Sequence, residues 1–176
     1  LVRQERFKPG DCAVMYRVNA QSRALEEACL HRGMKYRLVG GVRFYQRREV
    51  KDLMAYLRLL YNPLDEVSLS RIINIPPRGI GAKSLQQLVQ WAREQNVPLL
   101  TAMQRIAASM SAGETCPVPL ASRAANSIAK LATILDELAE LSGQLQVVDL
   151  IDRVLEVTGF RNFIQNSEDR AEERWE

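Results

Sequence analysis

Two adjacent residues near the N-terminus, Tyr16 and Arg17, combine side chains that suit a nucleotide. An aromatic ring can stack on a base, and a guanidinium can bind phosphate oxygens with two parallel hydrogen bonds. The pair ends a short apolar run, Cys12–Tyr16, which has the length of a strand. Ligands of open α/β sheets bind at the carboxyl ends of strands, where this pair is expected. The alternative is a solvent-facing pair on an edge strand, because the dipeptide by itself is common.

A second group of candidate residues lies at Arg78, Gly79, Gly81 and Lys83, just before a predicted helix. Glycines let backbone N–H groups approach a phosphate closely, and the amino end of a helix attracts anions. Arg78 and Lys83 add positive charge. These residues predict a contact with a phosphate group, and the alternative is a tight turn between helices that needs a positive φ.

A third candidate is the junction between two predicted helices at Gly159, with Arg161 just beyond it. It is a candidate phosphate contact, although the surrounding acidic residues argue against a broad phosphate-binding surface. No metal site is predicted, because His31 is the only histidine and no Cys-x-x-Cys pair exists. For the same reason a catalytic triad that depends on histidine is not expected.

The elements that must position these residues change in type along the chain. A strand at 12–16, a helix at 20–32 and a strand at 36–39 form a predicted βαβ unit, whose other strands must come from elsewhere. Apolar spacing then predicts only helices, at 50–61, 65–73 (capped by Asp65), 82–95, 99–108, 121–141, from 147 to the Thr158-Gly159 stop, and from 160 onward. The expected fold class is therefore mainly α with a small α/β part.

Composition sets the outer limits. The 176 residues are 47% hydrophobic and 26% charged, which is enough apolar material for a sizeable core. No run of about 18 apolar residues predicts a membrane span, and no secretory signal is visible. Three widely spaced cysteines indicate a reducing cytoplasm, with Cys12 and Cys29 expected as core thiols.

Charge is distributed unevenly. Residues 1–60 carry a net charge of +7, residues 61–110 carry +2, and residues 111–176 carry −6. Such asymmetry indicates either a face for nucleic acid or phosphate or an ordinary solvated basic face. The small residues, glycine and prolines of 109–119 mark the clearest change in composition, so a domain boundary is predicted at about residue 110.

The run Ala13–Arg23, followed by Leu25-Glu26-Glu27-Ala28, resembles motif IV of the UvrD/PcrA/Rep family of superfamily 1 DNA helicases. In that family a hydrophobic strand leads into YR, then NAQSR, then a helix that begins L/EEAL. The likeness continues in order through Tyr36–Arg37, Gly40–Phe44, Glu49–Asp52, Tyr56–Arg58 and Asn74–Gly81. Val50 and Pro77 are conservative departures. Beyond residue 110 the likeness is limited to helix pattern and a final Arg-Trp-Glu.

The resemblance implies a protein with two RecA-like motor domains, 1A and 2A, and helical inserts 1B and 2B. ATP binds between the motors and single-stranded DNA crosses them. By this resemblance, residues 1–110 are part of 2A and residues 111–176 part of 2B, whose start could be as early as about 62. The fold would be a partial RecA-like βαβ edge followed by a helical bundle. Tyr16 would stack on adenine, and Arg17 would approach the γ-phosphate as the catalytic residue.

The chain has no G-x-x-x-x-G-K-[ST] phosphate loop and no acidic Mg²⁺-binding motif after a strand. We therefore expect it to be inactive alone, with no cofactor bound. Its parent is expected to be a cytoplasmic ATP-dependent DNA helicase that uses ATP and Mg²⁺ in repair or replication. By the resemblance, the phosphate-contact candidates would bind DNA, namely Arg78, Gly79, Gly81, Lys83, Gly159 and Arg161. Expected partners are single-stranded DNA, a duplex junction and the rest of the same helicase chain. Two alternatives are a motor piece of a helicase–nuclease and a stand-alone nucleic-acid-binding or adaptor module.

Overall fold

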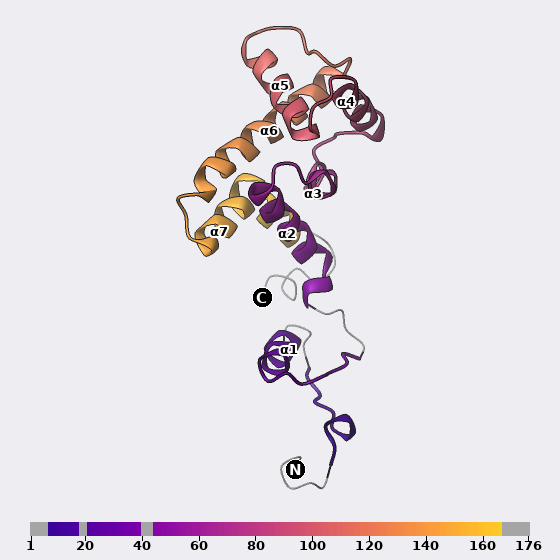
Figure 1. Ribbon diagram of the computed structural model, residues 1–176, viewed down its shortest axis with the longest axis vertical. Helices are drawn as coiled ribbons and strands as arrows, with labels where there is room; N and C mark the ends of the chain where they lie inside the picture. Colours follow the sequence, from indigo (N-terminus) through magenta and orange to yellow (C-terminus); the bar gives the residue numbers. More distant parts are fainter. Residues whose placement is uncertain (1–6, 18–20, 40–43, 167–176) are drawn as a thin grey trace. The chain divides into compact units, whose positions relative to one another are not determined.

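A computed structural model describes residues 7–17, 21–39 and 44–166 (Figure 1). The chain divides into two compact units, one formed by residues 1–51 and 167–176 and the other by Asp52–Asn166. Each unit is described by itself below. Among the described residues, no helix is long and apolar enough to cross a membrane.

The described residues of the first unit include the α-helix α1 (Gln21–His31) and the 3₁₀ turns η2 (Pro9–Asp11) and η3 (Phe44–Gln46). The α1 helix ends at Gly33, whose φ of +62° is the left-handed conformation that favours glycine. There the amides of Gly33 and Met34 donate to the carbonyls of Leu30 and Cys29 at 3.0 and 2.9 Å. The helix predicted at 20–32, with a glycine stop, is thus confirmed over the described residues.

The two strands predicted on either side of α1 are not found among the residues that the structure describes. Segments 12–16 and 36–39 contain no strand, so the predicted α/β part is not seen. A parallel strand exists only through hydrogen bonds to neighbouring strands, and two isolated segments supply too few. Consistent with this, Met15 is 94% exposed. Cys12 is exposed as well, so its expected place in a core is wrong, whereas Cys29 is half-buried.

The second unit consists of helices, which confirms the mainly helical fold class. They are α2 (Arg48–Tyr61), which begins just before the boundary, α3 (Glu66–Ile72), α4 (Ala82–Glu94), α5 (Leu99–Ser111), α6 (Ser122–Ser142), α7 (Val147–Val157) and α8 (Phe160–Gln165). In Figure 1 the long α6 runs from the α4–α5 end of this unit to the α7 end. It packs on α5 near one end and on α7 near the other.

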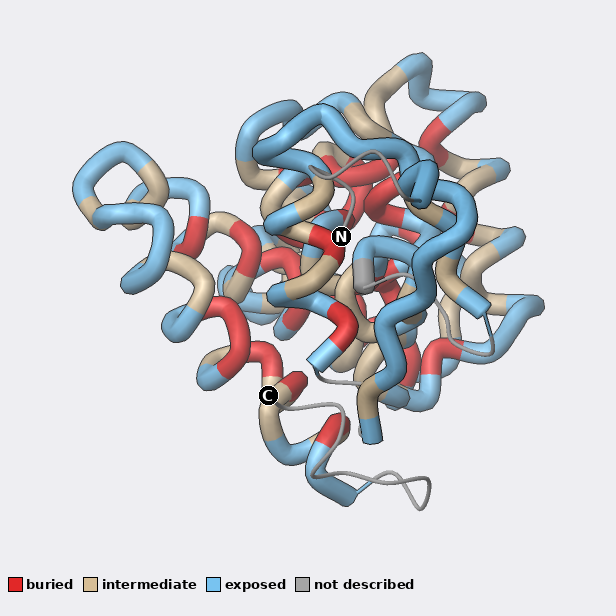
Figure 2. The backbone as a smooth tube through the Cα atoms, turned by 90° about the horizontal axis from the view of Figure 1, so that it is seen from below, coloured by how far each residue is buried: buried red, intermediate tan, exposed pale blue. Residues whose placement is uncertain are grey.

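The core of the second unit forms along α6. Ile128, Leu131, Leu135 and Leu138 are almost completely buried, as their alternating spacing of three and four residues predicts. They belong to one cluster with apolar side chains of α5, including Met103. Figure 2 shows buried residues recurring at intervals along the helices, as expected for amphipathic helices with one apolar face.

The predicted boundary at residue 110 falls inside the second unit. Residue 110 lies in the last turn of α5, which packs against α6, and Val118 of the loop between them is buried in their core. The two compact units divide between Lys51 and Asp52, and the domain boundary at about residue 110 stays a prediction. A stretch rich in small residues and proline marks a loop, but it does not show whether the helices around it share a core.

Helix α2 buries part of the apolar stripe that its sequence displays, together with the face beside it. Leu53, Leu57 and Leu60 of the stripe are half-buried against the core, whereas Tyr61 is 93% exposed. Asp52, Tyr56 and Leu59, which lie beside the stripe, are fully buried. Asp52 can be buried because Arg71 of α3 donates to its Oδ1 at 2.6 Å, and Tyr56 because its hydroxyl has polar partners, described next.

Candidate functional site

The loop between α3 and α4 carries the second group of predicted site residues. Helix α3 begins at Asp65, whose carboxylate accepts from the Ser68 amide at 2.9 Å, so the predicted N-cap is confirmed. Pro76 and Pro77 cannot continue the helix, and the chain turns at Gly79, which has a φ of +73°. Gly81 is then the N-cap of α4.

Arg78 directs its guanidinium into this loop. Nη1 donates to the carbonyls of Ile72 and Pro76 at 3.0 and 3.2 Å, with a longer contact to Ile73. Nη2 donates to the hydroxyl of Tyr56 at 2.7 Å. The planar guanidinium thus connects the end of α3, the proline segment and α2. Between the two roles open for Arg78, this geometry gives it a structural one, and its contact with DNA stays a prediction.

Tyr56 is the buried partner of Arg78. Its side chain is 0% exposed, and its hydroxyl donates to the carbonyl of Ile75 at 2.5 Å. Burial raises the pKa of the Tyr56 hydroxyl, while the charge and hydrogen bond of Arg78 and a hydrogen bond with Thr158 act in the opposite direction. Tyr56 is therefore a neutral phenol at physiological pH.

The backbone of the same loop is held from α6. Ser127 donates to the carbonyl of Arg78 at 2.9 Å. One turn earlier on α6, Nε of Arg123 lies 3.6 Å from the position that a Cβ on Gly79 would take. Arg123 and Lys83 are both exposed. Two cationic side chains thus flank the amino end of α4, where Gly81 has no side chain to cap the first N–H groups.

The third candidate, the turn at Gly159, also adopts a left-handed conformation, with a φ of +73°. Arg161 donates to Oδ1 of Asp152 at 2.8 Å, so the predicted DNA-contacting cation is ion-paired with α7. Phe160, next to the glycine, is buried with its ring edge-on to the ring of Tyr56 at a centroid distance of 6.2 Å. The structure thus brings the Arg78 loop and the Gly159 turn to the same buried tyrosine.

The nucleotide candidates Tyr16 and Arg17 lie in the first unit. Tyr16 is half-buried and Arg17 exposed, and the Arg17 amide donates to Oε1 of Gln21 in the first turn of α1 at 3.2 Å. The carboxylate of Glu26, on α1, accepts from the hydroxyl of Tyr36 at 2.9 Å. This bond ties the helix to the segment at 36–39. In the part of the chain that the structure describes, no cluster of His, Cys, Asp or Glu is arranged to hold a metal ion.

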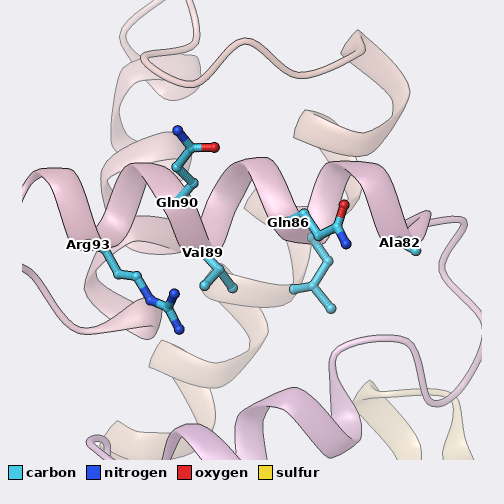
Figure 3. A pocket seen from close by; sticks show the side chains of 6 residues that line it. Ala82, Gln86, Val89, Gln90 and Arg93 are labelled. Atoms are coloured by element: carbon cyan, nitrogen blue, oxygen red, sulfur yellow. The ribbon is translucent and has the colours of Figure 1, made fainter.

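One face of α4 forms an open hollow of about 640 Å³ (Figure 3). It is lined by Ala82, Leu85, Gln86, Val89, Gln90 and Arg93. Leu85 and Val89, which the periodicity predicts to face inward, are half-buried at the margin of the core. The hollow contains none of the predicted site residues.

Sequence reasoning missed two residues that position the loop, namely Tyr56 and Ser127. A signal for Tyr56 was present, because Asp52, Tyr56 and Leu59 share one helical face at spacings of four and three. The carboxylate of Asp52 and the hydroxyl of Tyr56 made this face resemble an exposed one, although each group has a hydrogen-bond partner inside the unit.

Comparison with known proteins agrees with the helical unit and its loop. The chain is 35% identical over 158 residues to the ATP-dependent DNA helicase PcrA of Bacillus subtilis, an alignment that spans 90% of this chain and 20% of that protein. It is 36% identical over 155 residues to DNA helicase II of Escherichia coli, spanning 88% of this chain and 20% of the relative. The chain thus corresponds to about one fifth of the length of these relatives.

A family model extends over the N-terminal part of the chain. The model of the UvrD-like helicase C-terminal domain matches residues 1–111. This segment includes Tyr16, Arg17 and the Arg78–Gly81 loop, whereas the third candidate, at Gly159 and Arg161, lies outside it. The match exceeds half of the chain and agrees with the motif resemblance seen in the sequence; the chain belongs to the UvrD-like helicase family.

Proposed function

We propose that this chain is part of an ATP-dependent DNA helicase, and that its second unit contacts DNA at the amino end of α4. The observation that carries the proposal is the setting of Gly81. A Cβ added there would meet nothing within 4 Å, so a phosphate has room to reach the first amides of the helix. Lys83 and Arg123 supply exposed positive charge beside them.

The proposed nucleotide contact lies in the first unit, at Tyr16 and Arg17. A half-buried ring fits an adenine face, and an exposed guanidinium fits a γ-phosphate. The sequence has no phosphate loop, so in a longer protein other segments would hold the remaining phosphates and the Mg²⁺. Mg²⁺ bound to ATP would neutralise phosphate charge, and Arg17 would bind the charge that remains on the γ-phosphate.

The wider role follows from the family. We propose that residues 1–110 correspond to part of motor domain 2A and residues 111–176 to part of insert 2B, with a start of 2B at about residue 62 as the alternative. The expected substrates are single-stranded DNA and a duplex junction, unwound in repair or replication. A cytoplasmic location is supported by the three cysteines, which are all free thiols.

The DNA contact can be tested on the 176-residue chain with a fluorescent duplex–single-strand junction at low salt. Gly81→Ala should weaken binding several-fold and leave the melting temperature unchanged, since its φ of −70° suits alanine and its surroundings are open. Gly143→Ala is the matched control, at a φ of −80° with nothing within 4 Å. Equal binding by both variants would contradict the proposed contact.

Salt dependence tests the role of the cations. Lys83→Ala should reduce the slope of log K against log salt by about one, because one fewer counterion is released. The nucleotide contact needs a longer protein that contains the phosphate loop. There Arg17→Ala should abolish most ATP turnover and preserve DNA binding, and unchanged turnover would refute its role.

A further inference from the structure

The loop before α4 contains backbone donors that make no hydrogen bond. Among the residues that the structure describes, the amides of Gly79, Ile80 and Gly81 donate to no acceptor. Gly79 has a φ of +73°, and the side chain of Ile80 is buried in the core. Because these amides make no bonds of their own, their directions depend on the groups that hold the chain on either side.

Arg78 is the group that holds the chain before these amides. Its Nη1 donates to the carbonyls of Ile72 and Pro76 at 3.0 and 3.2 Å, and its Nη2 donates to the hydroxyl of the buried Tyr56 at 2.7 Å. Its own amide donates to Oδ1 of Asn74 at 2.8 Å. In the part of the chain that the structure describes, both terminal nitrogens therefore bond to neutral acceptors, and no carboxylate pairs with the guanidinium.

The carbonyl of Arg78 is held from outside the loop. Ser127 of α6 donates to it at 2.9 Å, from a position 49 residues further along the chain. A peptide group is planar, so this carbonyl shares its plane with the amide of Gly79, the first of the three free donors. The hydrogen bond from Ser127 thus restricts the direction in which the Gly79 N–H points.

We propose that Arg78 is a positioning residue for DNA binding and not a phosphate ligand: together with Ser127 it fixes the backbone from which the amides of 79–81 meet phosphate. The inference rests on the proposed function for its DNA readout. To reach DNA, the guanidinium would have to leave four acceptors. Lys83 and Arg123, in contrast, are exposed and have no hydrogen-bond or ion-pair partner among the described residues.

Two substitutions of Arg78 separate the two roles on the 176-residue chain. A phosphate ligand tolerates lysine, which keeps the charge, whereas a positioning residue needs the planar guanidinium. We therefore expect Arg78→Lys and Arg78→Gln alike to raise the dissociation constant for the fluorescent duplex–single-strand junction about fivefold at a matched folded fraction. Arg78→Gln should reduce the slope of log K against log salt by less than about 0.5.

Arg93→Gln is the matched control for these variants. It removes an exposed cation from the last turn of α4, at the opposite end from the loop. It should bind the junction like the parent chain. A loss of affinity equal to that of Arg78→Gln would assign the effect to net charge and overturn the positioning role.

Ser127→Ala tests the loop without a change of charge and serves also if the Arg78 variants fail to fold. Alanine favours a helix more than serine does, so α6 should be retained. The dissociation constant should rise about threefold with an unchanged salt slope. Ser142→Ala is the matched control on α6, because its hydroxyl donates to the carbonyl of Ala139 in the same helix at 2.7 Å, and it should bind like the parent chain.

Hydrogen exchange on the DNA-free chain measures the positioning directly. The amides of Ile75 and Arg78 donate within this segment, to the Ile72 carbonyl at 2.9 Å and to Oδ1 of Asn74 at 2.8 Å. In Arg78→Lys and in Ser127→Ala, the amides of residues 75 and 78 should exchange several-fold faster, while those in the middle of α6 stay protected. Unchanged exchange at either position would overturn the positioning role.

The outcomes also separate this inference from the proposed function. If the parent chain does not bind the junction, the proposed function fails, and hydrogen exchange still decides whether Arg78 and Ser127 order the loop. If the parent binds, Arg78→Lys keeps its affinity and Arg78→Gln loses about one unit of salt slope, then Arg78 is a phosphate ligand. The positioning role is refuted in that case, and the DNA contact stands.

Discussion

The hydroxyl of Tyr56 accepts a hydrogen bond of 2.7 Å from Nη2 of Arg78, a residue 22 positions later in the chain. This bond joins α2 to the loop before α4 inside the core. Burial disfavours the phenolate of Tyr56 and outweighs the opposing effect of the Arg78 cation, so the pKa of the hydroxyl is raised. The relationship therefore has a consequence for stability at high pH.

The first prediction concerns alkaline unfolding. Burial raises the pKa of Tyr56 above its ordinary value of 10.0, so the unfolded chain releases this proton at a lower pH than the folded chain. The stabilisation by Tyr56 is then complete below pH 10 and is lost as pH rises through the folded-state pKa. Tyr56→Phe should cost about 1–2 kcal/mol at pH 8 and progressively less above pH 10. Urea unfolding of the parent chain and of Tyr56→Phe at pH 8 and above pH 10 measures this. A difference in the free energy of unfolding that stays the same at both pH values would contradict it.

The second prediction compares two glycines. Gly79 has a φ of +73°, whereas Gly143 has a φ of −80° and open space around it. Gly79→Ala should lower the free energy of unfolding by about 1–2 kcal/mol, because the left-handed conformation is strained for alanine. Gly143→Ala should change it by less than about 0.5 kcal/mol. Equal stability of the two variants in urea unfolding would contradict this prediction, because it would mean that the turn accommodates alanine at position 79 without strain.

The third prediction concerns the cap of α3. Asp65 accepts from both the hydroxyl and the amide of Ser68, at 2.6 and 2.9 Å, and these bonds lower its pKa. Its stabilising contribution is therefore present above its ordinary pKa and is lost as pH falls through the lowered value. Asp65→Ala should reduce the melting temperature at pH 7, and the difference from the parent should shrink towards pH 3. Asp65→Asn, which can still cap, should lie between them.

Local signals predicted the elements well because their causes are local. The spacing of Ala124, Ile128, Leu131 and Leu138 predicts α6, and each of these side chains is buried. The cap at Asp65 depends only on a residue three positions away. Such features are determined within one or two helical turns, so the sequence displays them directly.

The features that were not predicted depend on residues far apart in the chain. The bond from Arg78 to Tyr56 and the one from Ser127 to Arg78 span 22 and 49 positions. The apolar periodicity placed Tyr61 on the stripe of α2 and gave Tyr56 no role. A hydropathy pattern contains no information on whether a distant guanidinium forms a hydrogen bond with a buried hydroxyl. The predicted strands at 12–16 and 36–39 failed to appear for a related reason, since a strand needs neighbours that an isolated βαβ unit lacks.

The last prediction concerns the ion pair between Arg161 and Asp152, at 2.8 Å on the surface of the second unit. An exposed pair contributes little, so Asp152→Asn should change the free energy of unfolding by less than about 1 kcal/mol. If the Gly159 turn contacts DNA, removing the carboxylate ends its competition with phosphate for Arg161. Junction binding should then tighten and the salt slope should steepen by up to about one.

A matched control separates this local effect from the general gain of one positive charge. Glu156→Gln makes the same charge change one turn further along α7, where the carboxylate pairs with Arg153 at 3.2 Å instead of with the turn. Both variants become less repulsive towards DNA, but only Asp152→Asn removes a carboxylate that pairs with Arg161, next to Gly159. Equal gains in affinity would assign the effect to net charge and remove Arg161 from the proposed contact. A larger gain for Asp152→Asn would place the phosphate at the turn.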